Sequence, residues 1–161
     1  MMRFRPRPIR AYADTTVFGG ITSVEFEPAS RAFFEEVRDG RFTLVVAVPL
    51  RKEIAVAPVE VRELFAEMQA YAEPVLVNDE VETLQRAYLD ARILAVKSET
   101  DALHVAIASV YGCELIVSWN FRHIVREPKI ERFNKVNLAN GYNRVAIHSP
   151  PEVIYEKEKR V

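Results

Sequence analysis

Phe42-Thr43-Leu44-Val45-Val46-Ala47-Val48 is a near-continuous apolar run, interrupted by a single threonine. A run of this kind is typical of a strand buried on both faces, as in a parallel sheet with helices on either side. Pro49 follows directly and cannot continue a central strand, because it has no N–H group to offer a neighbouring strand. We therefore expect a buried strand that ends before Pro49, and this strand indicates an α/β fold.

Shorter apolar segments around this run alternate with helical patterns. We expect further strands at residues 9–13, 75–77, 115–118 and 145–148. Apolar spacing predicts helices at 28–39, 50–57 and 59–71, from 78 or 79 to 94, from Thr100 to Gly112, and in pieces over 124–139. Gly19 and Gly20 predict a loop from Asp14 onward. This alternation predicts an α/β domain with a central, mostly parallel sheet flanked by helices.

The chain is 161 residues long, which fits one domain with a real core. It has no internal repeat, low-complexity segment or linker, so we expect a single domain over residues 1–161. Residues 1–8 are expected to form a basic arm and residues 152–161 a charged tail. The N-terminal arginines, at 3, 5, 7 and 10, are interpreted as solvated, with phosphate contact as the alternative.

Composition limits the classes of function. The chain is 49% hydrophobic and 28% charged, and its formal net charge is -1. A net charge this close to zero gives no overall electrostatic attraction to nucleic acid or membrane. A polyanion would therefore be held by a local patch or through a metal. The single cysteine, Cys113, excludes an internal disulfide and a multi-cysteine zinc site, and it favours a reducing, cytoplasmic setting.

No membrane or secretory segment is evident. Pro6 and Pro8 interrupt the N-terminal segment, which lacks the apolar core of a signal peptide. No stretch of the sequence is long enough to span a bilayer.

Asp14 is the first candidate functional residue, since it closes the predicted strand at 9–13. An aspartate after a strand is often only a turn or cap residue. However, the first strand of an α/β sheet is commonly central, and ligands bind where the chain reverses its progress across the sheet. Thr15 and Thr16 would add hydroxyl and N–H groups there. Carboxylates that meet at such a crevice repel each other unless a cation holds them.

Asp101 begins the small-residue helical run Ala102-Leu103-His104-Val105-Ala106-Ile107-Ala108. Ser98 and Asp101 also match a capping box, which accounts for an acid here without any chemistry. His104 lies on the same helix face as Asp101, and we interpret it as a satisfied core or supporting histidine. Glu99 could replace Asp101 in a site role.

The segment Ser118-Trp119-Asn120-Phe121-Arg122-His123 directly follows a predicted strand. Asn120 can bind a hard cation through its carbonyl oxygen but brings no charge. His123 is a candidate metal or phosphate contact, with a surface histidine as the alternative. Trp119 and Phe121 are interpreted as packing residues. Glu53, on the helix after the long strand, is either a crevice ligand or a solvated acid.

Several enzyme motifs are missing. The chain has no glycine-rich phosphate loop and no serine-centred nucleophile elbow. A receiver-type or phosphatase-type domain that uses Asp14 as phospho-acceptor predicts further acids beside it and a lysine after the last strand. Asp14 has Ala13 and Thr15 as neighbours, which disfavours that class.

The order of these elements resembles the PIN domain. The resemblance covers nearly the whole chain, and its most specific part runs from Asp101 to Ile124, with Trp119-Asn120-Phe121-Arg122-His123 near its end. It implies a three-layer fold with a parallel sheet between helices. It also implies a magnesium- or manganese-dependent ribonuclease of the small VapC-like kind, the toxin half of a toxin–antitoxin pair, which commonly forms homodimers.

By this resemblance, Asp14, Glu53 and Asp101 are the Mg²⁺ or Mn²⁺ ligands. Asn120 stands where many catalytic members carry a fourth acid, which would weaken a second metal ion more than the first. Thr15, Arg122 and His123 are expected to contact RNA, and for Arg122 and His123 this expectation rests on charge alone and not on the resemblance. The alternative is a degenerate PIN-like module that binds RNA or protein without cleaving it, and Asn120 favours it.

Overall fold

A single parallel sheet forms the centre of the computed structural model, which describes residues 7–93 and 98–155. Its strand order is β3-β2-β1-β4-β5. The strands are β1 (Ile9–Ala13), β2 (Phe42–Ala47), β3 (Ala72–Val75), β4 (Leu115–Val117) and β5 (Ala146–His148). Every strand pair is parallel, so the predicted α/β class is confirmed.

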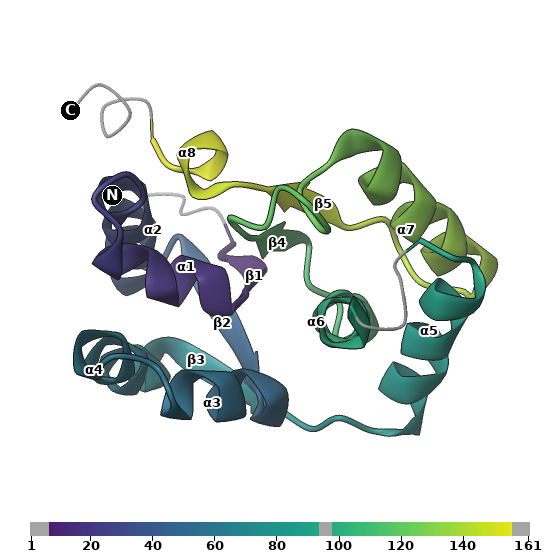
Figure 1. The fold of residues 1–161 in the computed structure, drawn as a ribbon, viewed down its shortest axis with the longest axis horizontal. Helices are drawn as coiled ribbons and strands as arrows, with labels where there is room; N and C mark the ends of the chain where they lie inside the picture. Colours follow the sequence, from purple (N-terminus) through teal and green to yellow (C-terminus); the bar gives the residue numbers. More distant parts are fainter. Residues whose placement is uncertain (1–6, 94–97, 156–161) are drawn as a thin grey trace, which may run out of the picture.

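Helices cover both faces of the sheet and give the fold three layers (Figure 1). One outer layer holds α1 (Thr15–Gly19), α2 (Glu27–Arg38), α3 (Val48–Ala55), α4 (Val59–Met68) and α8 (Pro150–Val153). The other holds α5 (Asp79–Asp90), α6 (Glu99–Val110) and α7 (Glu127–Ala139). Two short 3-10 helices, η1 (Gly20–Thr22) and η2 (Gln69–Tyr71), lie beside α1 and α4.

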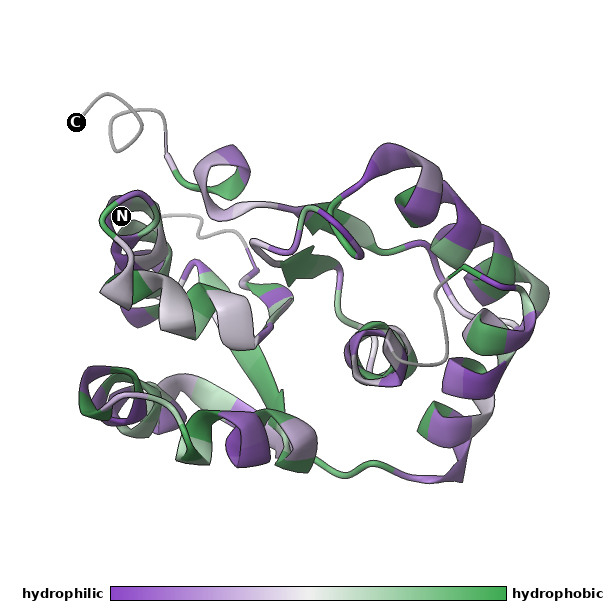
Figure 2. Cartoon of the chain, in the orientation of Figure 1, coloured by the Kyte–Doolittle hydropathy of each residue, from purple (hydrophilic) through white to green (hydrophobic). Residues whose placement is uncertain are grey.

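Successive residues of the central strand β1 point into opposite layers. Ala11 and Ala13 pack in the cluster under α1, α2, α3 and α4, whereas Tyr12 packs under α5, α6 and α7. This is the two-residue period of a strand with both faces buried. Figure 2 shows β2 as apolar, whereas the helices around the sheet carry both polar and apolar residues.

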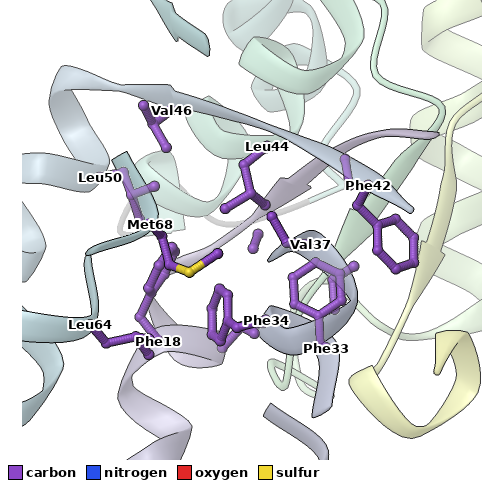
Figure 3. Close-up of a cluster of buried hydrophobic side chains, with 14 of the residues drawn as sticks. Phe18, Phe33, Phe34, Val37, Phe42, Leu44, Val46, Leu50, Leu64 and Met68 are labelled. Atoms are coloured by element: carbon purple, nitrogen blue, oxygen red, sulfur yellow. The ribbon is translucent and has the colours of Figure 1, made fainter. Parts of the chain in front are cut away.

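The first cluster is filled by aromatic rings of α1 and α2 (Figure 3). Phe34 lies between Phe18 and Phe33, with ring centroids 4.6 and 5.3 Å away. Such offset and edge-on pairs stabilise a core beyond the area they bury. The predicted helix stripe of Phe33, Phe34 and Val37 is therefore confirmed as core.

The predicted loop from Asp14 to Gly20 is wrong, because α1 and η1 occupy it. Asp14 caps α1 by accepting a hydrogen bond from the Thr16 N–H. Gly19 and Gly20 both have right-handed helical dihedral angles, so neither ends the element by a turn. A close approach explains Gly20, since a Cβ there would lie 2.5 Å from the Ser30 hydroxyl oxygen.

The edge strand β3 also differs from the prediction. It spans Ala72–Val75 rather than 75–77, and it includes Pro74. Proline is tolerated there because β3 is an edge strand and needs hydrogen bonds on one side only. The exposed Leu76 lies beyond the strand. Helix α7 likewise begins at Glu127, after the predicted start at 124.

The C-terminal segment packs on the domain further than expected. Val153 and Ile154 are buried in the first cluster, although the charged tail was predicted from residue 152. The Arg41 guanidinium lies 4.3 Å from the Tyr155 ring centroid, and the Tyr155 N–H donates to Glu36 at 3.0 Å. The predicted tail residues 156–161 and arm residues 1–6 lie outside the described residues.

None of the helices in the described part of the chain has the length and apolar character needed to cross a bilayer.

Candidate active site

The candidate site lies at the carboxyl ends of β1 and β4, where the chain reverses its progress across the sheet. After β1, the chain adds β2 and β3 on one side and then crosses to add β4 and β5 on the other (Figure 1). Ligands of open α/β sheets bind at such a switch point. Asp14 follows β1 and Ser118 follows β4, so the predicted central position of Asp14 is confirmed.

Asp14 is held by hydrogen bonds from both strand ends. Its side chain is 3% exposed. The carboxylate oxygen Oδ1 accepts from the Thr16 N–H at 3.0 Å and from the Thr16 hydroxyl. Oδ2 accepts from the Ser118 hydroxyl at 2.5 Å. Thr16 also accepts the Trp119 N–H at 2.8 Å, which ties the segment after β4 to α1.

The environment of Asp14 disfavours its charge. Burial raises the pKa of the Asp14 carboxyl above its ordinary value, and the hydrogen bonds from Ser118 and Thr16, together with the charge of His104, counter this only in part. All three donors to the carboxylate are neutral groups. A buried carboxylate without a cationic partner is either protonated or stabilised by a bound cation.

Glu53 approaches the same carboxyl-end edge of the sheet from α3, which directly follows β2. Its Oε1 accepts from the Thr15 hydroxyl at 2.8 Å and from His104 Nε2 at 2.6 Å. Partial burial acts to raise the pKa of Glu53, but the hydrogen bond from His104, the charge of His104 and the hydrogen bond from Thr15 together outweigh it and the pKa is lowered. Glu53 is thus ionised and directed by its neighbours, unlike a freely solvated acid.

His104 connects Glu53 to Tyr12 in the core under α5, α6 and α7. It is 3% exposed, and its Nδ1 is hydrogen-bonded to the Tyr12 hydroxyl. Burial, followed by the charges of Asp14 and Glu53, raises the pKa of the Tyr12 hydroxyl well above its usual value. Tyr12 therefore stays protonated and can donate its proton to His104.

Asp101 lies in the first turn of α6, on the side of the strand ends. The predicted capping box is not formed, because the Ser98 side chain makes no capping hydrogen bond. Burial raises the pKa of Asp101, while the charge of His123 and then that of His104 lower it. Asp101 is thus an ionisable group of the crevice. Glu99, the predicted substitute, is exposed.

Both polar atoms of the Asn120 side chain are hydrogen-bonded. Its side-chain Oδ1 accepts from the His123 N–H at 3.0 Å, and its Nδ2 donates to Asp101 Oδ1 at 3.4 Å. Its own N–H donates to the Ser118 hydroxyl oxygen at 2.9 Å. Asn120 therefore links Asp101 to the Ser118–Asp14 pair and supplies Asp101 with a neutral donor.

The predicted RNA-contacting residues occupy different environments. Arg122 is exposed and His123 is half-buried at the rim beside Asp101. The Thr15 hydroxyl is directed to Glu53 instead. Trp119 packs as predicted, stacked on Phe26 at 4.1 Å, with its indole N–H donating to Ser30 at 2.9 Å. The Phe121 side chain is 51% exposed, unlike a packing residue.

The candidate ligands are oxygen donors of the kind that Mg²⁺ and Mn²⁺ prefer. Within residues 7–93 and 98–155, however, no three histidine, cysteine, aspartate or glutamate side chains are grouped closely enough to hold a metal ion. A cavity of about 760 Å³ between α5 and α6 contains none of the three acids. Any shared cation would therefore have to draw Asp14, Glu53 and Asp101 closer together.

Two of the strongest contacts were not predicted from the sequence. Ser118 was noted only as a strand end, and Tyr12 only as part of a strand. Tyr12 reaches His104 because it points into the layer that holds α6, and Ser118 reaches Asp14 because the two residues follow the paired strands β4 and β1. His104 was interpreted as a core or supporting residue, and its burial and its bond to Glu53 agree with this.

Comparison with known proteins gives no independent identification. No family model matches the chain, and no curated protein matches it.

Proposed function

We propose that the chain is a metal-dependent endoribonuclease, which hydrolyses RNA phosphodiester bonds at the carboxyl ends of β1 and β4. The observation that carries this proposal is the buried Asp14 carboxylate, whose hydrogen-bond donors are all neutral. Its position at the topological switch point, with Glu53 and Asp101 around it, is where an α/β fold binds its ligands. The resemblance of residues 101–124 to the PIN domain supports the same activity.

Asp14, Glu53 and Asp101 would hold Mg²⁺ or Mn²⁺. When bound, such an ion activates a water molecule and neutralises the developing charge on the leaving oxygen. The carboxylates' contribution is to crowd negative charge into one crevice, which makes cation binding favourable. Exposed Arg122 and half-buried His123 are the rim residues suited to hold the phosphate backbone.

A degenerate PIN-like module is the second candidate, and two observations favour it. The Asn120 side chain is already occupied by His123 and Asp101. In addition, the described residues contain no ready-made group of three metal ligands. Such a module would bind RNA or protein at the same crevice without cleavage.

The proposed cellular role is that of a toxin, neutralised in the cytoplasm by a small antitoxin, with the active chain a homodimer. Inducible expression in growing bacteria tests it: the native chain should arrest growth and Asp14→Asn should not. Equal growth with both chains contradicts the toxin role. Sedimentation of the purified chain distinguishes a dimer from a monomer.

Cleavage of end-labelled RNA oligonucleotides of random sequence tests the nuclease directly. The native chain with Mn²⁺ should cut, whereas the native chain with EDTA and the Asp14→Asn variant should not. Asp39→Asn is the matched control, because Asp39 is an exposed acid at the end of α2. RNA binding without cleavage under every condition would support the degenerate module instead.

A further inference from the structure

We propose that His104 is a positioning residue, which holds Glu53 by one carboxylate oxygen, Oε1, and leaves the other, Oε2, to a divalent cation. This inference rests on the proposed function and assigns a role to a residue outside the three carboxylates. It predicts that His104 governs metal affinity without touching the metal.

The hydrogen bonds to Glu53 are distributed unevenly over its two oxygens. Oε1 accepts both from the Thr15 hydroxyl at 2.8 Å and from His104 Nε2 at 2.6 Å. Oε2 has no hydrogen bond within the described part of the chain. Two donors on one oxygen fix the carboxylate plane while the second oxygen keeps its lone pairs, as required of a monodentate ligand.

Tyr12 determines which nitrogen of His104 carries the proton. The Tyr12 hydroxyl lies against Nδ1 of His104 in the core. When this hydroxyl donates to Nδ1, that nitrogen is the acceptor and Nε2 carries the proton. The Nε2–H group then donates to Glu53, so a directed chain runs from Tyr12 through His104 to the crevice.

This series of hydrogen bonds connects the two helical layers. Tyr12 belongs to β1, His104 to α6 and Glu53 to α3, and 51 positions separate His104 from Glu53. If His104 had only a structural role, any nearby acceptor, such as a backbone carbonyl, would satisfy its N–H group. His104 instead uses a carboxylate that is 35% exposed. Outer residues that orient a ligating group typically change metal affinity or activity by about 10–100-fold when replaced.

Calorimetric titration with Mn²⁺ of the native chain and two His104 variants tests the role. His104→Leu removes the donor to Glu53, and its Mn²⁺ affinity should fall by about 10–100-fold. His104→Gln keeps an N–H donor near the Nε2 position and should restore most of the affinity. Ser109→Ala is the control, since Ser109 is a buried hydroxyl of α6 that bonds Tyr88 and Asn137. Its affinity for Mn²⁺ should be unchanged.

Nitrogen-15 NMR of the imidazole rings provides a readout that needs no metal. The chain has three histidines, so His104→Gln assigns the His104 signals by their loss. The native ring should carry a proton on Nε2 with Nδ1 as the acceptor, and Tyr12→Phe should reduce that preference.

The outcomes separate this inference from the proposed function. If the native chain binds Mn²⁺ and His104→Leu binds it equally well, the positioning role is wrong and the metal site stands. If the native chain binds no Mn²⁺, the proposed function fails and the positioning role fails with it. A ring with its proton on Nδ1 and none on Nε2 would overturn the directed hydrogen-bond chain whatever the titration gives.

Discussion

The Ser118 hydroxyl donates to Asp14 at 2.5 Å, although the two residues are 104 positions apart in the sequence. The bond joins the ends of β4 and β1 at the switch point of the sheet. It also leaves Asp14 with neutral partners only, because Thr16 supplies the other donors. A structural turn residue at this place would satisfy its carboxylate near water, whereas Asp14 is buried.

Replacing Asp14 by asparagine should stabilise the metal-free chain at high pH. Burial raises the pKa of Asp14, so the folded state holds more protons than the unfolded state between the two pKa values, and stability falls as pH rises through that window. In EDTA, Asp14→Asn should therefore gain on the native chain as the pH rises above about 4, the ordinary pKa of an aspartate. We expect a gain of about 1 kcal/mol, or roughly 2–4 °C in Tm. A pH-independent difference between the two chains would contradict the assignment.

Replacing Asn120 by aspartate should make the fold depend more strongly on a cation. The variant keeps the oxygen that accepts from His123, but it exchanges the donor to Asp101 for a second negative charge. Without metal, the loss of this hydrogen bond should cost about 1 kcal/mol in unfolding free energy. With Mn²⁺, affinity should increase and a second ion should bind more readily. Calorimetry measures both; unchanged affinity and unchanged stoichiometry would show that Asn120 lies outside the metal site.

Substitution by alanine should have opposite effects on stability at the adjacent residues Gly19 and Gly20. Both have helical dihedral angles that alanine adopts readily. A Cβ on Gly19 meets nothing within 4 Å, so Gly19→Ala should stabilise the chain by about 0.5 kcal/mol. A Cβ on Gly20 would lie 2.5 Å from the Ser30 oxygen and 2.9 Å from the Trp119 indole nitrogen.

Gly20→Ala should therefore destabilise the chain by about 1–3 kcal/mol and disturb the single tryptophan. Urea unfolding followed by tryptophan fluorescence measures both effects at once. Equal behaviour of the two variants would mean that the close packing of Gly20 against Ser30 and Trp119 is relaxed at no cost.

Two arginines of similar exposure should differ in their value to stability. The Arg41 side chain is 28% exposed and pairs with Glu36, which is only 6% exposed. Arg38 is 26% exposed and pairs with Glu35 and Glu67, both 65% exposed. Arg41→Met leaves a buried carboxylate without its partner, which should cost about 3 kcal/mol. Arg38→Met should cost less than about 1 kcal/mol.

Urea unfolding of both methionine variants compares these values. Arg41 also donates to the Val153 carbonyl oxygen at 2.6 Å and stacks on Tyr155, so its loss should loosen α8 as well. Protease cleavage near the C-terminus should then become faster in Arg41→Met. Equal costs for the two variants would contradict the role given to the burial of Glu36.

The parallel sheet followed from the sequence because its signals are local. The apolar run at Phe42–Ala47 needs only its own composition to be recognised as a strand with two buried faces. The segment after Asp14 was mispredicted, since Gly20 is fixed by the approach of Ser30 and Trp119, which belong to other elements. The edge strand β3 was displaced because its pairing with β2, and not its composition, determines which residues it includes.

The candidate site likewise has features that local sequence predicts and features that depend on tertiary contacts. The sequence was enough to name Asp14, Glu53 and Asp101 as candidates, because they stand at strand ends and helix starts. The strand order brings those positions to the carboxyl-end edge of the sheet. The hydrogen bonds that Ser118, Tyr12 and His104 make could not be predicted, because they depend on strand register and on contacts across the sheet. Such partners become visible only in three dimensions.

Calorimetric titration of Mn²⁺ into the native chain and into Asp14→Asn tests the central claim most directly. The account predicts that the native chain binds Mn²⁺ and that Asp14→Asn does not, because the buried carboxylate is the centre of the site. Binding of Mn²⁺ to neither chain, or equally to both, would contradict it and remove the basis for metal-assisted RNA hydrolysis at this crevice.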